Sequence, residues 1–304
     1  MVTTSTAQPS TAPGRALLAP PAFERVTALL RIAGWSPLTL AGAVIVAAFL
    51  LVATIGPLFS PYPPLAQDIL SSRQPPSPTH WFGTDELGRD VLSRIIAGAR
   101  ITLLASASTL ALAGGVGVAL GLVTGYLRGR VDRILMRFVD VQLAIPGLVL
   151  ALVIISAMGN SPNALVLAVS FMSYPTFARL TRGVTLRVRE QEYVVAARAL
   201  GSSPARVMIQ HVLPNVIPHV LALATVTLGR VVLALAGLGF LGFGLEPGTP
   251  EWGLMISQGR ATFLTLPHLV FFPGMAIAVV VLGFNLLGDG LRDYLDPRLR
   301  RART

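Results

Sequence analysis

The sequence has no lysine among its 304 residues, so all 24 of its basic residues are arginine. A Walker A loop binds nucleotide phosphates through a lysine, and Schiff-base and pyridoxal enzymes react through a lysine amine. Both activities are excluded for this chain, and any linked ATP hydrolysis must come from another subunit. Cysteine is also absent. This excludes disulfides, thiol nucleophiles, zinc sites with cysteine ligands and iron–sulfur clusters.

Charge is scarce as well, because only 12% of the residues are charged while 53% are hydrophobic. Soluble domains carry about 25% charged residues, so the composition favours a membrane protein and excludes disorder. The formal net charge of +10 is typical of nucleic-acid-binding proteins too. A basic groove requires a water-soluble fold to carry it, so we expect no nucleic-acid partner.

Long uncharged stretches indicate six transmembrane helices. A helix needs about 20 residues to cross a bilayer, and an ionised side chain at its centre is costly. The stretch 141–178 is twice as long as one span requires. The turn residues at 159–163 divide it into a helical hairpin. No β-barrel alternation is visible. The other expected spans are 38–56, 101–127, 216–242 and 269–287.

The arginines beside these spans predict that both termini lie in the cytoplasm. With the amino terminus inside, the cytoplasmic segments contain 18 arginines and the external segments contain 5. Positive charge favours the cytoplasmic side, so an even number of spans is expected. The chain then divides into a flexible cytoplasmic tail (1–24), a first span with an external loop (25–100), a main transmembrane domain (101–290) and a basic cytoplasmic tail (291–304).

The longest cytoplasmic loop, 179–214, is suited to contact another protein. Its first part is rich in helix formers and is expected to stop at Gly201. Ser202 or Ser203 is placed to cap a second helix whose first turn contains Pro204, where no backbone N–H is needed. Two short helices joined by a sharp turn would form a compact knob that fits a cleft on a partner.

This loop resembles the EAA signature of permease subunits of ABC importers, in which Ala-Ala, a glycine four residues on and a downstream Leu-Pro recur at fixed spacing. Val195 and His211 depart from the general signature. The variant is similar to that of the dipeptide, oligopeptide and nickel permease subfamily. The matching residues are Tyr193, Val194, Ala196, Ala197, Arg198, Leu200, Gly201, Leu213 and Pro214.

Further segments resemble the same subfamily in the right order, at 80–94, 132–146, 240–244, 251–253 and 285–298. The resemblance implies an all-α integral membrane protein with the type I ABC importer permease fold, in the inner membrane of a bacterium. It also implies a second homologous permease subunit, two cytoplasmic ATPases, an extracytoplasmic substrate-binding protein and contact with membrane lipid. This chain would have no catalytic site and bind no metal or cofactor, because ATP and Mg belong to the ATPases.

The resemblance further implies that the loop couples transport to ATP hydrolysis, through a coupling helix over 196–208. A rigid knob joined to two spans can convert movement of a partner into movement of those spans. The residues alone leave open a basic connector that only sets orientation. The coupling residues implied by the resemblance are Tyr193, Ala196, Ala197, Arg198, Gly201, Ser202, Pro204, Leu213 and Pro214.

Two features inside the spans are also candidates. Gly117, Gly121 and Gly125 recur every four residues and form a small-residue face where another helix can approach closely. That helix belongs either to the same chain, which we favour, or to the partner permease. Arg230 lies within the fifth span, where charge is costly unless it is paired or faces water. A structural ion pair and a place on the translocation pathway are both open.

The loop after the first span contains three acidic residues that could suggest a cation site. Asp85, Glu86 and Asp90 are interleaved with Arg89 and Arg94, and the EF-hand spacing is missing. We therefore expect ion pairs and a helix cap here.

The sequence thus predicts a permease subunit that imports dipeptides or oligopeptides by alternating access. An alternative within the family is nickel or another small solute. A second alternative, from another class, is an ion-coupled secondary transporter, which would normally carry acidic residues in mid-membrane. A third is an intramembrane enzyme, for which no GxSxG elbow or Ser/His/Asp set is recognisable.

Overall fold

The computed structural model describes residues 36–295, and its regular structure there is helical apart from one isolated β-bridge. The expected all-α fold is therefore confirmed for the described part. The expected tail 1–24 lies outside the described residues, as do residues 296–304. The α-helices are α2 (Pro37–Ile55), α3 (Val91–Leu127), α4 (Gly129–Leu143), α5 (Gly147–Met158), α6 (Pro162–Val188), α7 (Glu192–Ala199), α8 (Pro204–Val207), α9 (Leu213–Phe240), α10 (Trp252–Gly259) and α11 (His268–Leu295).

Two expected segment boundaries differ from the observed helices. The helix α3 begins at Val91, so residues 91–100 of the expected loop segment are helical. The last helix continues to Leu295, so the carboxyl-terminal basic segment does not begin as a tail at 291. In both cases the helix continues through charged residues, because charge does not prevent a helix from extending beyond the bilayer.

Five helical stretches in the described part are long and apolar enough to cross a membrane. They are Pro37–Phe59, Val91–Leu127, Pro162–Val188, Pro204–Phe240 and His268–Tyr294. A sixth span exists if α4 and α5 count as one, but these two helices are bent by 94°. The break precedes Pro146, which has no backbone N–H and stands at the start of α5.

The predicted hairpin over 141–178 is therefore only partly correct. Its turn is confirmed, because α5 ends at Met158 and α6 begins at Pro162. The expected start of the third span near Val141 differs from the structure, since α4 starts at Gly129 and includes Asp132 and Asp140. These charges suggested a cytoplasmic connector.

The starts of α2, α3 and α6 coincide with side chains that satisfy free backbone N–H groups. The capping oxygens accept from N–H groups of the first turn at 2.8 to 3.2 Å. The capping residues of α2, α3 and α6 are Ser36, Asp90 and Ser161.

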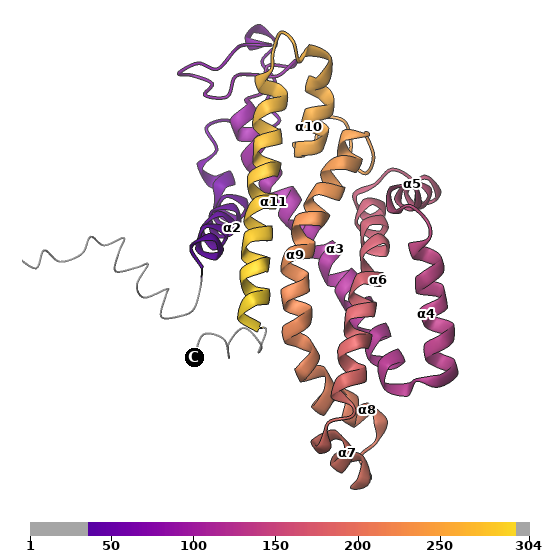
Figure 1. Cartoon of the computed structure of the whole chain (residues 1–304). Helices are drawn as coiled ribbons and strands as arrows, with labels where there is room; N and C mark the ends of the chain where they lie inside the picture. Colours follow the sequence, from indigo (N-terminus) through magenta and orange to yellow (C-terminus); the bar gives the residue numbers. More distant parts are fainter. Residues whose placement is uncertain (1–35, 296–304) are drawn as a thin grey trace, which may run out of the picture. The chain divides into compact units, whose positions relative to one another are not determined.

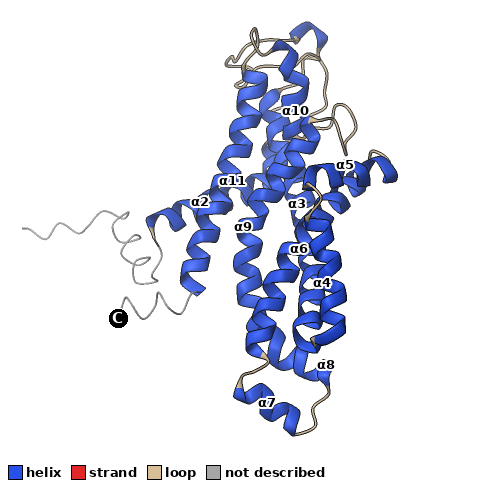
Figure 2. Ribbon diagram, turned by 45° about the vertical axis from the view of Figure 1, so that its right-hand side comes forward, coloured by secondary structure: helices blue, strands red, loops and turns tan. Residues whose placement is uncertain are grey.

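The long helices α3, α6, α9 and α11 form the body of the described part (Figures 1 and 2). The helices α3 and α6 approach each other closely along the stripe Gly117, Gly121 and Gly125. A Cβ atom at any of these glycines would lie 2.5 to 2.7 Å from an atom of α6. The stripe thus faces a helix of the same chain, and nothing larger than glycine fits without a shift.

A second packed region joins α2, α3, α10 and α11. The Phe49 ring lies 6.0 Å from that of Trp252 and 5.9 Å from that of Phe284. Trp252 is 2% exposed, and its indole N–H donates to the Ile95 carbonyl at 3.0 Å. This cluster fixes α10 against the bundle at the end opposite to α7 (Figures 1 and 2).

Candidate functional site

The predicted coupling segment forms the tip of the molecule, at α7 and α8 (Figure 1). It is shorter than the predicted loop 179–214, because α6 continues as a helix to Val188. The turn after α7 is closed by two backbone bonds. The Gly201 N–H donates to the Arg198 carbonyl at 3.0 Å, and the Ser202 N–H donates to the Ala197 carbonyl at 3.1 Å. This is a Schellman motif, which requires a left-handed residue. Gly201 supplies it with φ = +85°.

The second half of the knob differs from the prediction. Ser203, and not Ser202, caps α8, since its hydroxyl accepts from the Arg206 N–H at 3.4 Å. Pro204 occupies the first turn as expected. However, α8 is not a separate helix. It continues through a π-helical turn, Met208–Val212, into α9, so that residues 204–240 form one long stretch.

No single helix extends over the predicted segment 196–208, because the chain leaves the helix at residues 200–203. The short helix is α7 alone. Pro214 stands at the start of α9, directly after the π-helical turn. Its missing N–H removes one helical hydrogen bond, and Leu213 beside it is only partly buried.

One face of α7 is anchored and the other is exposed. Val194 is fully buried in a cluster formed by Leu122 and Tyr126 of α3 and by valines of α6, α8, α9 and the π-helical turn. The opposite face exposes apolar surface, which includes Tyr193, Val195 and Leu200 at 46%, 44% and 87% exposure. Ala196 is exposed as well, and Ala197 and Arg198 are half-buried. An exposed apolar patch of this kind on a firmly anchored short helix marks an interaction surface.

The base of α7 is tied to the junction of α3 and α4. The Glu190 carboxylate forms ion pairs with Arg128 at 2.8 Å and with Arg189 at 3.1 Å. The Arg189 guanidinium lies 5.7 Å from the centre of the Tyr126 ring and donates to the Tyr126 carbonyl. Arg198 of α7 in turn donates to the Arg189 carbonyl at 3.4 Å. Displacement of α7 would therefore act directly on α3 and α6.

Arg230 is exposed on α9 and forms no hydrogen bond or ion pair with the residues of 36–295. A structural ion pair, one of the two explanations left open by the sequence, is not found in this part of the chain. Gly117, Gly121 and Gly125 lie elsewhere, along the interior contact with α6 described above.

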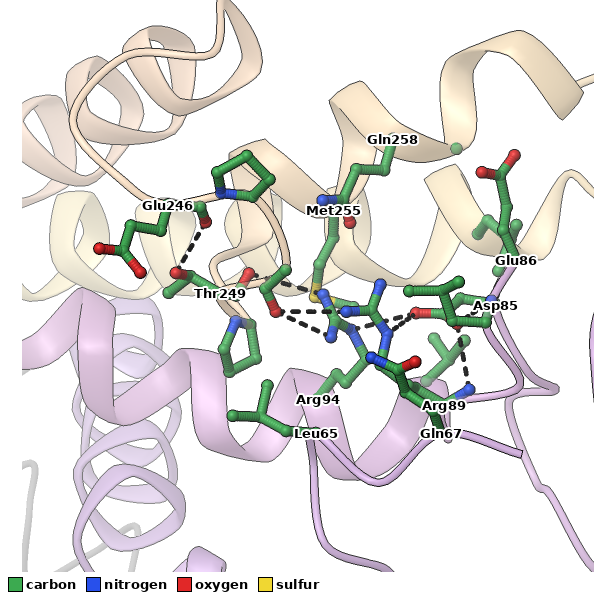
Figure 3. A pocket seen from close by; sticks show the side chains of 17 residues that line it. Leu65, Gln67, Asp85, Glu86, Arg89, Arg94, Glu246, Thr249, Met255 and Gln258 are labelled. Atoms are coloured by element: carbon green, nitrogen blue, oxygen red, sulfur yellow. Dashed lines mark hydrogen bonds and ion pairs between the residues drawn. The ribbon is translucent and has the colours of Figure 1, made fainter. Parts of the chain in front are cut away.

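At the opposite end, two buried arginines bind the loop before α10 (Figure 3). Arg89 and Arg94 share the Asp85 carboxylate, at 2.7 and 3.5 Å. Arg94 is 1% exposed and donates to the Gly248 carbonyl at 3.1 Å. Together with the cap that Asp90 provides for α3, these contacts confirm the expected ion pairs and helix cap. The cavity beside them has a volume of about 610 Å³.

Glu251 is a further buried group near this end, and the sequence prediction assigned it no role. Its two carboxylate oxygens accept from the N–H groups of Gly253 and Leu254 at 2.9 and 2.7 Å, which caps α10. Burial raises the pKa of Glu251 to about 7 despite these two hydrogen bonds. Ser, Thr, Asp and Asn are the usual capping residues, so a glutamate gives little signal.

Comparison with known proteins identifies the family. A family model described as the inner membrane component of binding-protein-dependent transport systems matches residues 117–301. A second, described as the N-terminal transmembrane domain of oligopeptide transport permease C, matches residues 36–76. The chain belongs to the binding-protein-dependent transport permeases. It is thus a multi-pass permease of the inner membrane.

Several relatives are similar over most of their length. A probable D,D-dipeptide transport system permease protein of Escherichia coli (strain K12) is 41% identical over 86% of this chain and 88% of the relative. A dipeptide transport system permease protein of Alkalihalophilus pseudofirmus is 38% identical over 86% of each chain. A glutathione transport system permease protein of Pectobacterium atrosepticum is 42% identical over 74% of this chain and 75% of the relative.

Solved structures support the fold. A structure of the MetNI methionine ABC transporter superposes with a TM-score of 0.55 and covers 69% of this chain and 96% of its own, at 19% identity. The predicted importer permease fold is therefore confirmed, and the permease family favours an importer subunit over an ion-coupled secondary transporter.

Proposed function

We propose that this permease imports dipeptides or oligopeptides and that α7 couples the transport to ATP hydrolysis by partner subunits. The coupling role is supported by how α7 is closed, anchored and exposed. It is closed by the Gly201 turn, anchored through Val194 and exposed on the face of Tyr193 and Leu200. Peptide import is supported by the substrates named for the relatives, two of which carry dipeptides and one glutathione. These names favour a peptide over nickel or another small solute, the alternative within the family.

The proposed assembly contains a second homologous permease, two cytoplasmic ATPases and an extracytoplasmic binding protein. The ATPases would bind ATP and Mg, so this chain would catalyse no covalent step. Tyr193 and Ala196 would face an ATPase from α7, with Ala197, Arg198, Ser202 and Pro204 holding the shape of the knob. Leu213 and Pro214 would transmit its movement into α9. Both termini would lie in the cytoplasm, and the main transmembrane domain would extend over 101–290.

Arg230 is proposed to line the translocation pathway. Its charge on a span has no partner in the described part of the chain, so water or a passing carboxylate would have to stabilise it. The Arg230→Gln variant tests this assignment by peptide uptake into vesicles that contain the whole importer. We expect lower uptake, and unchanged uptake would remove Arg230 from the pathway.

The coupling role is tested by Gly201→Asp in vesicles that contain the complete importer. An aspartate at φ = +85° strains the turn and moves α7, although nothing lies within 4 Å of the added Cβ. We expect the subunits to assemble normally and ATP hydrolysis to continue, while uptake of a radiolabelled dipeptide falls about tenfold or more.

Gly159→Asp is the matched control. Gly159 has the same φ of +85° and equally open surroundings, but it lies in the turn between α5 and α6. This variant should retain its ratio of uptake to ATP hydrolysis. Normal uptake by Gly201→Asp would contradict the coupling role, and an equal loss in both variants would assign the effect to general backbone strain.

A further inference from the structure

The surface of α4 is unusual because its acidic residues face the rest of its own chain. Arg182 of α6 binds Asp132 through two bonds of 2.6 and 2.7 Å. Arg179, one turn earlier on α6, binds Asp140 at 2.6 Å. The two carboxylates of α4 are therefore neutralised from inside the molecule, and the opposite face of the helix points outward.

That outward face carries an apolar stripe. Four large apolar residues recur at spacings of three and four, which places them on one side of the helix. They are Val131, Ile134, Phe138 and Val141, with exposed fractions of 41%, 57%, 68% and 59%. A stripe of this length is unfavourable in water. It is compatible with hydrocarbon chains in a multi-pass membrane protein.

A row of arginines runs beside the apolar stripe. Arg130, Arg133 and Arg137 follow the same spacing of three and four, and all three are exposed. None of them forms an ion pair or hydrogen bond with residues 36–295. Because the acids of α4 are already bound by Arg179 and Arg182, this row has an uncompensated positive charge.

A cavity of about 970 Å³ lies along α4, with Arg182 of α6 at its border, and both arginines and apolar side chains of α4 line it. Its lining contains cationic and apolar side chains, and also the two carboxylates that Arg182 and Arg179 already bind. The lining side chains are Arg133, Arg137, Arg182, Asp132, Asp140, Ile134, Met136, Phe138 and Val141. Guanidinium groups bind phosphate through paired, charge-assisted hydrogen bonds. Basic pockets between transmembrane helices are also the kind of site that binds anionic lipid headgroups.

We propose that this groove binds an anionic phospholipid, with the phosphate at Arg133 and Arg137 and an acyl chain along Ile134, Phe138 and Val141. The occupant is a lipid because the groove combines unpaired cations with an apolar wall on a membrane-spanning chain. We place this lipid in the cytoplasmic leaflet of the membrane. That placement rests on the proposed function, which puts the α3–α4 junction near the cytoplasm. The bound lipid would brace α4 against α6, which leads directly into α7.

The test measures lipid retention by native mass spectrometry of the full-length chain, released from micelles that contain equal amounts of phosphatidylglycerol and phosphatidylcholine. We expect the unmodified chain to retain phosphatidylglycerol preferentially. The double variant Arg133→Gln/Arg137→Gln should retain about tenfold less of it. This readout requires neither ATP nor substrate, so it can fail while the proposed transport function holds.

The matched control is Arg187→Gln/Arg292→Gln, which removes the same charge from exposed positions outside the groove. It should retain phosphatidylglycerol like the unmodified chain. Equal retention by the groove variant, or an equal loss in the control, would overturn the proposal. In the isolated importer, cross-linking of Phe138→Cys to another protein subunit would also overturn it, because that face would then be a protein interface.

Discussion

The Glu251 carboxylate is 5% exposed, and no cation of the described residues contributes to its pKa. Its pKa of about 7 lies above the ordinary value of 4.5, so the folded chain binds this proton more tightly than the unfolded chain does. The associated stability is fully present below pH 4.5 and is lost as the pH rises through the folded pKa near 7. The difference corresponds to about 3 kcal/mol.

We therefore expect the thermal unfolding midpoint of the detergent-solubilised chain to fall between about pH 5 and about pH 8. Glu251→Gln should flatten this dependence and be more stable than the unmodified chain at alkaline pH. Its amide loses one backbone hydrogen bond, worth about 1 kcal/mol, but it buries no charge. Glu246→Gln, at an exposed position of the same loop, should keep the original slope. An unchanged slope in Glu251→Gln would contradict the assignment.

Single residues differ in how clearly the sequence signals them. Gly201 was predictable as a helix stop, because it follows a run of helix formers and glycine alone adopts positive φ without strain. The sequence did not show whether Ser202 or Ser203 caps α8, because the two candidates differ by only one position. The Ser202 N–H closes the Schellman motif, which leaves Ser203 as the cap. The role of Glu251 depends on its burial, which no local pattern encodes.

At the scale of elements, the α3–α6 contact depends on its glycine stripe. Gly121→Ala would place a Cβ atom 2.5 Å from the Ala178 carbonyl oxygen, a backbone atom that cannot rotate away. We expect a loss of about 1–3 kcal/mol in stability from this overpacking. The fall should be visible as a lower thermal midpoint of the solubilised chain.

Gly114→Ala on the same helix is the counterpart, because nothing lies within 4 Å of its added Cβ. Alanine is the better helix former, so this change should stabilise the chain by about 0.5–1 kcal/mol. The two substitutions are chemically identical and should shift the thermal midpoint in opposite directions. A shift of the same sign in both would show that helix packing does not determine the effect.

The elements that the sequence predicted well are those with long uncharged runs, such as α2 and α11. The segment of α4 was assigned to a connector because its charges interrupt the apolar run. In the fold, Arg182 binds Asp132 and Arg179 binds Asp140. The two partners of each pair are 50 and 39 residues apart in the sequence. A single sequence does not disclose such pairing, so the groove beside α4 was not predictable.

At the scale of the whole molecule, the described part has two distinct ends. The end with α10 is held by Arg94 and Trp252, whereas the end with α7 presents exposed apolar side chains (Figures 1 and 2). Composition predicted a multi-span protein, and the distribution of arginines predicted which end is cytoplasmic. The fold brings the arginine-rich segments 127–141 and 179–211 together around α7, as the contact of Arg128 with Glu190 requires.

The absence of cysteine makes this orientation directly testable. Each introduced cysteine is the only thiol of the chain, so labelling by a membrane-impermeant maleimide reports one position. Trp81 and Leu200 are 67% and 87% exposed and lie near opposite ends. In intact cells Trp81→Cys should react at once, whereas Leu200→Cys should react only after the membrane is permeabilised. The reverse pattern would place α7 outside, beyond the reach of any cytoplasmic ATPase, and would remove the basis for coupling through Gly201.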